Sequence, residues 1–211
     1  MAARKRPKQA KRPGAGTRSG DPKQRLIAAA LELAAAQGWR RLGMAEIAEA
    51  AGLSLKEAYG VARSKYGLLA ALRRQTDEAM LAGGVVTGDS PRDRLFEALM
   101  RRFEALRPYR PGLRAVLRDS IGSPAAVGFL PGLLRSMGWT LSAAGLPAMG
   151  CRGRLARRFV GAIYVSVLPT FIRDEGADLG TTMAALDKRL RQAERLLSSL
   201  GPVLGGRRSA A

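Results

Sequence analysis

The hydrophobic residues of this chain recur with the spacing of amphipathic helices from residue 21 to about residue 200. In the front part, one apolar stripe runs from Leu26 towards Gly38 and a second from Met44 towards Gly52, and each glycine stands where a helix would end. Two further helices follow. The N-caps that the pattern predicts are Asp21, Ser54 and Ser64.

Behind a "TGDSP" break near residue 90, helical spacing continues in longer stretches separated by Pro or Gly. These predicted helices span roughly residues 91–107, 111–121, 125–145, 151–174 and 178–200. No stretch alternates in the manner of a β-strand. We therefore expect an all-α protein of about nine helices, in which a fourth helix links a small front domain to a larger helical domain.

The last predicted helix carries apolar residues at alternating spacings of three and four, from Met183 to Leu200. Such a stripe needs an apolar partner, which is either a helix of the same chain or a second chain across a two-fold axis. The long helix before it can supply the second half of a dimer interface. The residues predicted for that interface are Leu155, Phe159, Ile163, Met183, Leu186, Leu190 and Leu197.

The net charge is the most unusual feature of the composition. The chain is 46% hydrophobic, as folded proteins commonly are, but its formal charge is +19. Residues 1–20 hold seven Lys or Arg and no acidic residue, and we expect them to form a disordered basic arm. A positive field favours polyanions, so duplex DNA or an anionic membrane surface are the natural partners. Of the two, we expect DNA rather than membrane contact.

Missing residue types exclude several kinds of chemistry. His is absent and Cys151 is the single cysteine, which excludes mixed Cys/His zinc sites, Ser-His-Asp catalysis and an internal disulfide. We therefore expect no enzymatic activity, no catalytic residue, no metal and no cofactor. No apolar run reaches the roughly 20 residues that cross a bilayer, and no signal segment is evident, so a cytoplasmic location is expected.

The stretch "AGLSLKEAYGVARSK", residues 51–65, joins two short predicted helices through a turn at Gly52. This is the form of a helix-turn-helix, which can place its second helix in the major groove of DNA. Helix pairs of this kind also occur in proteins that never contact DNA. The geometry alone therefore leaves the function open.

The residues from about Arg25 to Leu72 resemble the DNA-binding domain of TetR-family transcriptional repressors. The similarity lies in "AAL.L....G" in the first helix, "IA..AG.S" through the second helix and turn, a following Tyr, and Ser64-Lys65 before two leucines. What the resemblance implies is a homodimeric repressor whose two recognition helices read the half-sites of a palindrome. The domains expected are a basic arm (1–20), a helix-turn-helix domain (21–83), a ligand-binding and dimerisation domain (84–203) and a disordered tail (204–211).

The DNA contacts implied by the resemblance lie around the start of the recognition helix. Ser54 can approach a phosphate, and Lys56 and Glu57 can reach base edges. Tyr59 and Lys65 stand where family members usually contact phosphates, although packing for Tyr59 and solvation for the lysines are the alternatives. The full set of expected DNA-contacting residues is Ala45, Ser54, Leu55, Lys56, Glu57, Tyr59, Gly60, Ser64 and Lys65.

The sequence also departs from the family pattern. Gly43 replaces a capping Thr, and Ala45 replaces an Arg or polar residue. Gly60 replaces a bulky residue at a cost of about 1 kcal/mol in a helix, and Ala62 replaces a core Phe at a cost of roughly 3 kcal/mol unless neighbours fill the space. The side chains considered for filling it are Trp39, Met44 and Leu55.

In the family, a small apolar effector enters the second domain and releases DNA by favouring another spacing of the recognition helices. The residues expected to line such a pocket are Phe96, Phe103, Phe129, Met137, Trp139, Tyr164 and Phe171, each with ordinary core packing as its alternative.

A competing function comes from "FIRDEGADLGTTMAALDKRL", residues 171–190, which is similar to the end of a lipid-binding family in ubiquinone biosynthesis. That family shares the TetR fold without acting as a repressor. Its front end lacks the pattern found here between Ala51 and Lys65, which favours the regulator.

Overall fold

The computed structural model describes residues 20–120 and 128–204, with side chains described as far as residue 196. Within these ranges the elements are helices, and the all-α prediction is confirmed. The predicted arm and tail lie outside the described residues, apart from residues 20 and 204.

The four front helices form where the capping pattern places them. They are α1 (Pro22–Gln37), α2 (Met44–Ala50), α3 (Leu55–Val61) and α4 (Lys65–Ala82). The Asp21 carboxylate accepts a hydrogen bond from the backbone N–H of Lys23 at 3.1 Å. The hydroxyls of Ser54 and Ser64 accept equivalent bonds at the starts of α3 and α4, so all three predicted caps are confirmed.

Small side chains allow the front helices to pack closely. Ala58 on α3 and Ala62 just after it are both buried. Trp39 is buried at 2% exposure and belongs to the same core, whereas Leu55 is 56% exposed and therefore does not fill the space beside Ala62. Within α3 the buried residue is Ala58, so most of the helix faces solvent.

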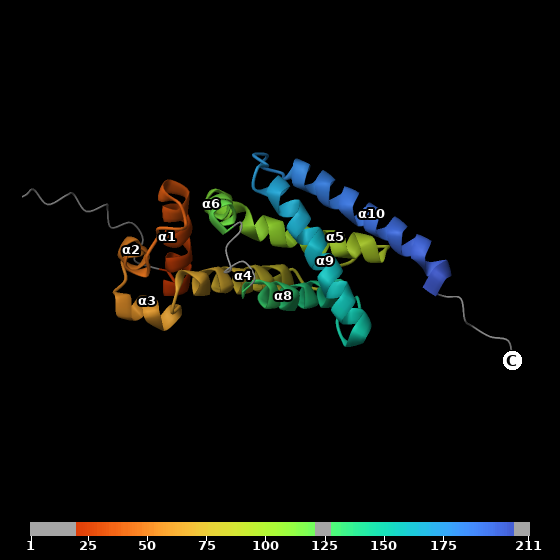
Figure 1. The fold of residues 1–211 in the computed structure, drawn as a ribbon, viewed down its shortest axis with the longest axis horizontal. Helices are drawn as coiled ribbons and strands as arrows, with labels where there is room; N and C mark the ends of the chain where they lie inside the picture. The colour runs from red at the N-terminus through yellow and green to blue at the C-terminus, as the bar shows by residue number, and fades with distance from the viewer. Residues whose placement is uncertain (1–19, 121–127, 205–211) are drawn as a thin grey trace, which may run out of the picture.

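The second domain contains the remaining helices. They are α5 (Pro91–Leu106), the 3-10 turn η1 (Arg107–Tyr109), α6 (Arg110–Ser120), α8 (Leu130–Ala143), α9 (Gly150–Phe171) and α10 (Gly180–Leu204). Of these, α9 and α10 are the longest helices in the described part of the chain. In Figure 1, α4 runs from the front domain along the second, and α9 crosses α5 beneath α10. The front domain also rests on α6 through α1.

Gly112 explains the close approach of α6 to α1. A Cβ atom at this position would lie only 2.4 Å from the backbone oxygen of Leu31. The absence of a side chain therefore lets the two helix backbones meet, and it ties the second domain to the front domain at a second place besides α4.

The apolar stripe of α10 packs mainly within its own chain. Leu186 and Leu190 are 0% and 3% exposed, and α10 packs against α9 and α5. Ile163 of α9 is buried in the same core. These three residues are therefore not available to a partner, contrary to their prediction as dimer contacts, because a stripe of this period fits a neighbouring helix of the same chain equally well.

Other residues predicted for the dimer interface remain open to solvent. Leu155 is 70% exposed, Met183 is 40% exposed and Phe159 is 36% exposed. Leu197 lies outside the residues whose side chains are described.

Candidate nucleic-acid interface

The outer face of α3 projects from the front domain. Ala58 anchors the helix in the core, while Leu55, Lys56, Tyr59 and Gly60 are exposed. Tyr59 is 61% exposed, so the packing alternative for this ring does not hold. α3 therefore offers a mixed apolar and basic surface of the kind that can enter a groove of DNA.

Arg63 adds a cation to this face that the sequence interpretation missed. Its guanidinium carbon lies 5.9 Å from the ring centre of Tyr59, and the side chain is exposed. Its position just beyond α3 gave no periodic signal, because it follows the end of the helix at Val61. Arg63 and Tyr59 together extend the exposed surface towards α4.

A reciprocal cap fixes the start of α3. The Glu57 carboxylate accepts hydrogen bonds from the backbone N–H of Ser54 at 2.7 Å and from its hydroxyl at 2.6 Å. The Ser54 hydroxyl in turn accepts the N–H of Glu57 at 3.2 Å. The hydroxyl bond, followed by the backbone bond, holds the pKa of Glu57 below its usual value. Both side chains thus serve the helix start, and a base contact by Glu57 would compete with the cap.

Arg25 holds the turn between α2 and α3 from the first helix. Its guanidinium donates to the carbonyl oxygens of Ala51 and Gly52, the latter at 3.2 Å. Gly52 has a φ of +64°, a left-handed conformation that favours glycine. The turn is therefore fixed by its own backbone and by a cross-link from α1.

Lys65 has a different role from the predicted phosphate contact. Its ammonium group donates to the backbone oxygens of Trp39, Arg40 and Leu42 at 2.7, 3.0 and 3.0 Å. Because an ammonium group has three N–H donors, none is left for a phosphate in this conformation. Burial, partly offset by Asp119, lowers the pKa of Lys65. Lys65 fixes the loop between α1 and α2 instead.

Asp119 of α6 holds the same loop from the second domain. Its carboxylate accepts the backbone N–H groups of Trp39 at 2.7 Å and Arg40 at 3.1 Å. The bond from Arg40 and that from the Arg118 side chain are the main causes that lower the pKa of Asp119. The loop before α2 is therefore clamped by both domains, an arrangement that has no local sequence signal.

The start of α2 compensates in part for its missing Thr cap. The backbone N–H of Gly43 donates to the Glu46 carboxylate at 2.9 Å. Ala45 is exposed beside it and presents only a methyl group. Ala45, Gly60 and Ser64 thus lie on the exposed surface but bring little chemistry of their own, since the Ser64 hydroxyl caps α4.

The predicted pocket residues do not gather in one place. Phe103, Met137, Tyr164 and Phe171 are buried in the core of the second domain, and Phe96 is half-buried against that core. Phe129 instead contacts Tyr66, with ring centres 6.0 Å apart, and Tyr66 contacts Trp39 at 6.1 Å. This aromatic row lies at the junction of the two domains.

Trp139 does not belong to the interior at all. It is 52% exposed on the outer side of α8, contrary to its prediction as a pocket residue. Helical spacing alone did not distinguish the two sides of α8, because the face that packs on the core is marked by small and polar residues such as Ser136 and Gly138.

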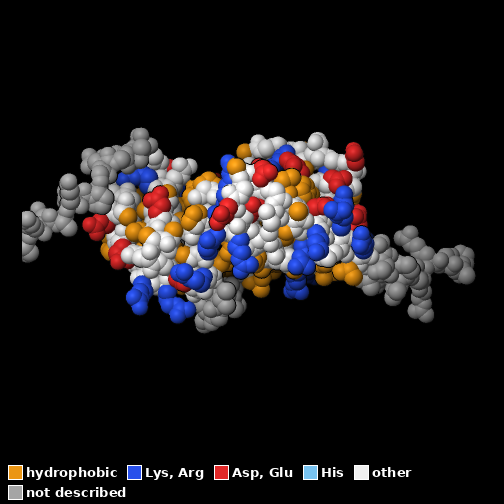
Figure 2. Space-filling view, turned by 90° about the horizontal axis from the view of Figure 1, so that it is seen from above, with side chains coloured by type: hydrophobic (Ala, Val, Ile, Leu, Met, Phe, Trp, Pro, Cys, Tyr) orange, Lys and Arg blue, Asp and Glu red, His pale blue; other side chains and the backbone are white. Residues whose placement is uncertain are grey.

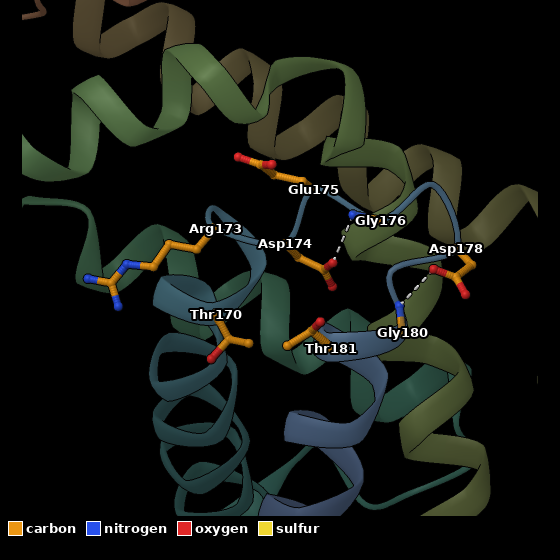
Figure 3. Close-up of a pocket in the computed structure, with 8 residues that line it drawn as sticks. All are labelled: Thr170, Arg173, Asp174, Glu175, Gly176, Asp178, Gly180 and Thr181. Carbon is orange, nitrogen blue, oxygen red and sulfur yellow. Dashed lines mark hydrogen bonds between the residues drawn. The ribbon is translucent and has the colours of Figure 1, made fainter.

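A polar hollow of about 430 Å³ lies at the turn between α9 and α10 (Figure 3). Two of its carboxylates, those of Asp174 and Asp178, are engaged by the turn itself. Asp174 accepts the N–H groups of Gly176 at 3.2 Å and Thr182 at 2.7 Å, and Asp178 accepts that of Gly180 at 3.2 Å. The hollow is therefore a product of the turn, and it contains none of the predicted pocket residues.

Basic side chains mark the surface of both domains. Figure 2 shows Lys and Arg along one edge of the face drawn there, the lower edge in that view, from the helix-turn-helix end to the opposite end. In the described ranges, no group of three or more His, Cys, Asp or Glu is placed to hold a metal ion. None of the helices in that part of the chain has the length and apolar character needed to cross a membrane.

Comparison with known proteins identifies the fold and the front segment. Residues 26–72 match the family model of "Bacterial regulatory proteins, tetR family". A TetR transcriptional regulator from Nitrosomonas europaea is 21% identical, with 83% of this chain and 99% of that chain covered and a TM-score of 0.65. A TetR transcriptional regulator from a Rhodococcus species is 21% identical, with 81% and 94% covered and a TM-score of 0.58.

A further similar structure, a tetR-family transcriptional regulator from Streptomyces coelicolor, is 20% identical, with 86% and 88% covered and a TM-score of 0.52. A search of curated proteins gave no match. At these identities the solved structures indicate a common fold, and the family model concerns the segment that contains α2, α3 and the turn between them.

Proposed function

We propose that this chain is a member of the tetR family of bacterial regulatory proteins, whose family model matches residues 26–72. On that premise, it is a homodimeric repressor of transcription. It binds a palindromic operator by placing one α3 helix of each protomer in successive turns of the major groove. A small effector bound in the second domain releases it from DNA.

The observation that carries this proposal is the exposed, firmly held α3. Lys56, Tyr59 and Arg63 face solvent, while the Ser54 cap, Arg25 and Lys65 fix the helix and the loops around it. A rigid scaffold that presents basic and aromatic groups loses little conformational entropy on binding. Lys56 and Leu55 are the residues that we assign to base edges, and Tyr59 and Arg63 to phosphates.

The dimer is proposed to form through the outer face of α9. Leu155, Phe159, Ala162, Ser166 and Pro169 follow one another at spacings of four, three, four and three, and all are exposed. The small residues Ala162 and Ser166 in the centre allow two helices to approach closely across a two-fold axis. Large apolar side chains at one end would then be covered by the partner.

The test is fluorescence anisotropy of the full chain on labelled fragments of its own upstream DNA, from about 50 to 200 mM salt, with scrambled competitor. The proposal predicts preference for one palindromic fragment. Lys56→Ala should weaken that binding roughly tenfold, which corresponds to about 1.4 kcal/mol. Lys188→Ala is the matched control, because Lys188 is also exposed but lies on α10.

Equal binding to every fragment that disappears at the higher salt would contradict operator recognition. It would leave only the non-specific attraction expected from the charge of the chain. Lipid retained through purification of such a protein would favour the lipid-binding alternative.

A further inference from the structure

A single carboxylate on α4 joins this helix to two helices of the second domain. Asp77 of α4 accepts hydrogen bonds on one oxygen from the guanidinium of Arg102 on α5 and from the hydroxyl of Ser136 on α8. Its other oxygen accepts from Arg73, one turn earlier on α4, at 3.3 Å. Arg102 and Ser136 are 1% and 0% exposed, so the contact that Asp77 makes with them is buried, whereas the side chain of Arg73 is 21% exposed.

The cluster contains more positive than negative charge. Arg73 and Arg102 share one carboxylate, and the neighbouring cations Arg74 and Arg135 act on Arg73 as well. The Nε of Arg102 is buried and has no hydrogen-bond acceptor among the described residues. A buried guanidinium with an unused donor is costly, because the group has lost water without a full replacement. A further anion would remove that imbalance.

Aromatic side chains lie directly beside this charge. The guanidinium carbon of Arg102 is 5.4 Å from the ring centre of Tyr164. Phe103 stands between Tyr164 and Phe171, with ring centres 5.0 and 5.1 Å apart. At the far end of this row, Arg110 lies 6.0 Å from the Phe171 ring, and its Nη1 is a second buried donor without an acceptor in the described part of the chain.

We infer that Arg102 is the receptor for a small organic acid with an apolar or aromatic body, whose carboxylate competes with Asp77 for the guanidinium. The ligand body would pack against the row formed by Tyr164, Phe103 and Phe171. The inference rests on the proposed function in one respect only, namely that this acid is the effector that releases DNA.

Competition at Arg102 provides a direct path to the front domain. α4 begins at Lys65, which clamps the loop before α2, and it contains Asp77. When the acid takes Arg102, Asp77 of α4 loses its ion pair with α5 and keeps the hydrogen bond from Ser136 of α8. Because Arg102 is closed to solvent, the acid can enter only if these helices separate. Binding and movement of α4 are therefore one event.

The first experiment compares acids with their uncharged amides on the full wild-type chain. Benzoate, 2-naphthoate and decanoate are each tested beside the corresponding amide, by thermal shift and by isothermal titration calorimetry. The inference predicts that at least one acid binds and raises Tm, and that its amide binds at least tenfold more weakly. Equal binding of acid and amide, or no binding of any acid at millimolar concentration, overturns it.

Substitution at Asp77 gives a result that a purely structural ion pair would not give. Asp77→Asn removes the competing carboxylate, so the acid should bind about tenfold more tightly and raise Tm more than in the wild type. Asp187→Asn is the control, since Asp187 pairs with Arg191 on the surface of α10. Acid binding that is unchanged in Asp77→Asn contradicts the competition.

Ser136→Ala provides a second variant in case Asp77→Asn does not fold. It removes the donor that would remain on Asp77 once the acid holds Arg102, so acid affinity should fall a few-fold, and unchanged affinity contradicts the inference. Arg102→Gln should abolish acid binding. These measurements need no DNA, so they test the acid site even if operator recognition fails. Acid that binds as expected but leaves the operator complex intact refutes only the assignment as effector.

Discussion

Around the helix-turn-helix, cationic side chains donate hydrogen bonds to backbone oxygens. Arg25 donates to Ala51 and Gly52, and Lys65 donates to three carbonyls of the loop before α2. In the second domain, the buried guanidinium of Arg102 ends on another side chain, the carboxylate of Asp77. The first arrangement fixes loop geometry whatever the neighbouring side chains are. The second depends on a charge that a ligand can replace.

This difference suits a separation of tasks between the two halves. Backbone clamps keep α3 and its turn in one geometry, as a surface that reads a rigid duplex requires. In the ion-pair cluster that joins α4, α5 and α8, Arg102 pairs with Asp77 in the structure and would pair with the carboxylate of the ligand when the proposed acid is bound. The front half is thus built to hold one state and the second half to exchange between two.

The largest effect is expected at the buried ion pair. Arg102→Met leaves Asp77 buried without its main partner and should lower the free energy of unfolding by about 3–5 kcal/mol. Urea denaturation followed by circular dichroism measures this change. Arg189→Met, on the exposed face of α10, is the matched control and should change stability by less than about 0.5 kcal/mol. A loss below about 1 kcal/mol at Arg102 would show that the pair is not a principal link between the helices.

The next effect tests whether Lys65 acts on the loop or on DNA. Lys65→Met removes three charge-assisted hydrogen bonds and should lower stability by about 2 kcal/mol. Because no N–H of Lys65 is left for a phosphate, the variant should bind DNA more weakly without a change in the salt dependence of its affinity. Lys56→Ala should leave stability nearly unchanged. A salt slope reduced by about one unit in Lys65→Met would contradict the loop-clamp role.

A fall in pH should weaken the contact that Asp119 makes between the two domains. The folded pKa of Asp119 lies below its usual value because its carboxylate accepts bonds from the loop and from Arg118. Its stabilising contribution is therefore present above the unfolded pKa, near about 4, and is lost as pH falls through the lower folded pKa. Urea midpoints between pH 7 and pH 3 should fall less steeply for Asp119→Asn than for the wild type. Identical pH profiles would show that this carboxylate carries no such linkage.

The smallest effect is a gain in stability at the recognition helix. A Cβ at Gly60 would meet nothing within 4 Å, so Gly60→Ala should stabilise the chain by about 1 kcal/mol through helix propensity alone. Gly112→Ala is the contrasting substitution, because its Cβ would strike the Leu31 backbone. It should destabilise by about 1–3 kcal/mol. Thermal unfolding of both variants measures the difference, and a loss of stability in Gly60→Ala would mean that the helix needs glycine at this position.

Local signals predicted much of the front domain. Asp21, Ser54 and Ser64 cap helices because a short polar side chain can reach the next free N–H, and Gly52 turns the chain because it tolerates a positive φ. These effects need no knowledge of distant residues. The four front helices therefore follow from the sequence almost residue by residue.

Contacts between distant residues could not be predicted in the same way. The residues next to Lys65 and Asp119 in the sequence do not indicate that both side chains form hydrogen bonds with the backbone of the loop before α2. The stripe of α10 specifies that an apolar partner exists, but its period does not distinguish a helix of the same chain from one of a second chain. Trp139 illustrates the same limit, since size and hydrophobicity placed it in a pocket and packing places it outside.

The most direct test of the central claim is hydroxyl-radical footprinting of the wild-type chain on its preferred upstream fragment. A dimer that inserts two α3 helices should protect two patches on one face of the duplex, roughly 34–36 Å or one helical turn apart. Lys56→Ala should need about tenfold more protein to give both protections, and Lys188→Ala should give them at the wild-type concentration. A single patch, or uniform weak protection along the fragment, would contradict a dimer that reads DNA through α3.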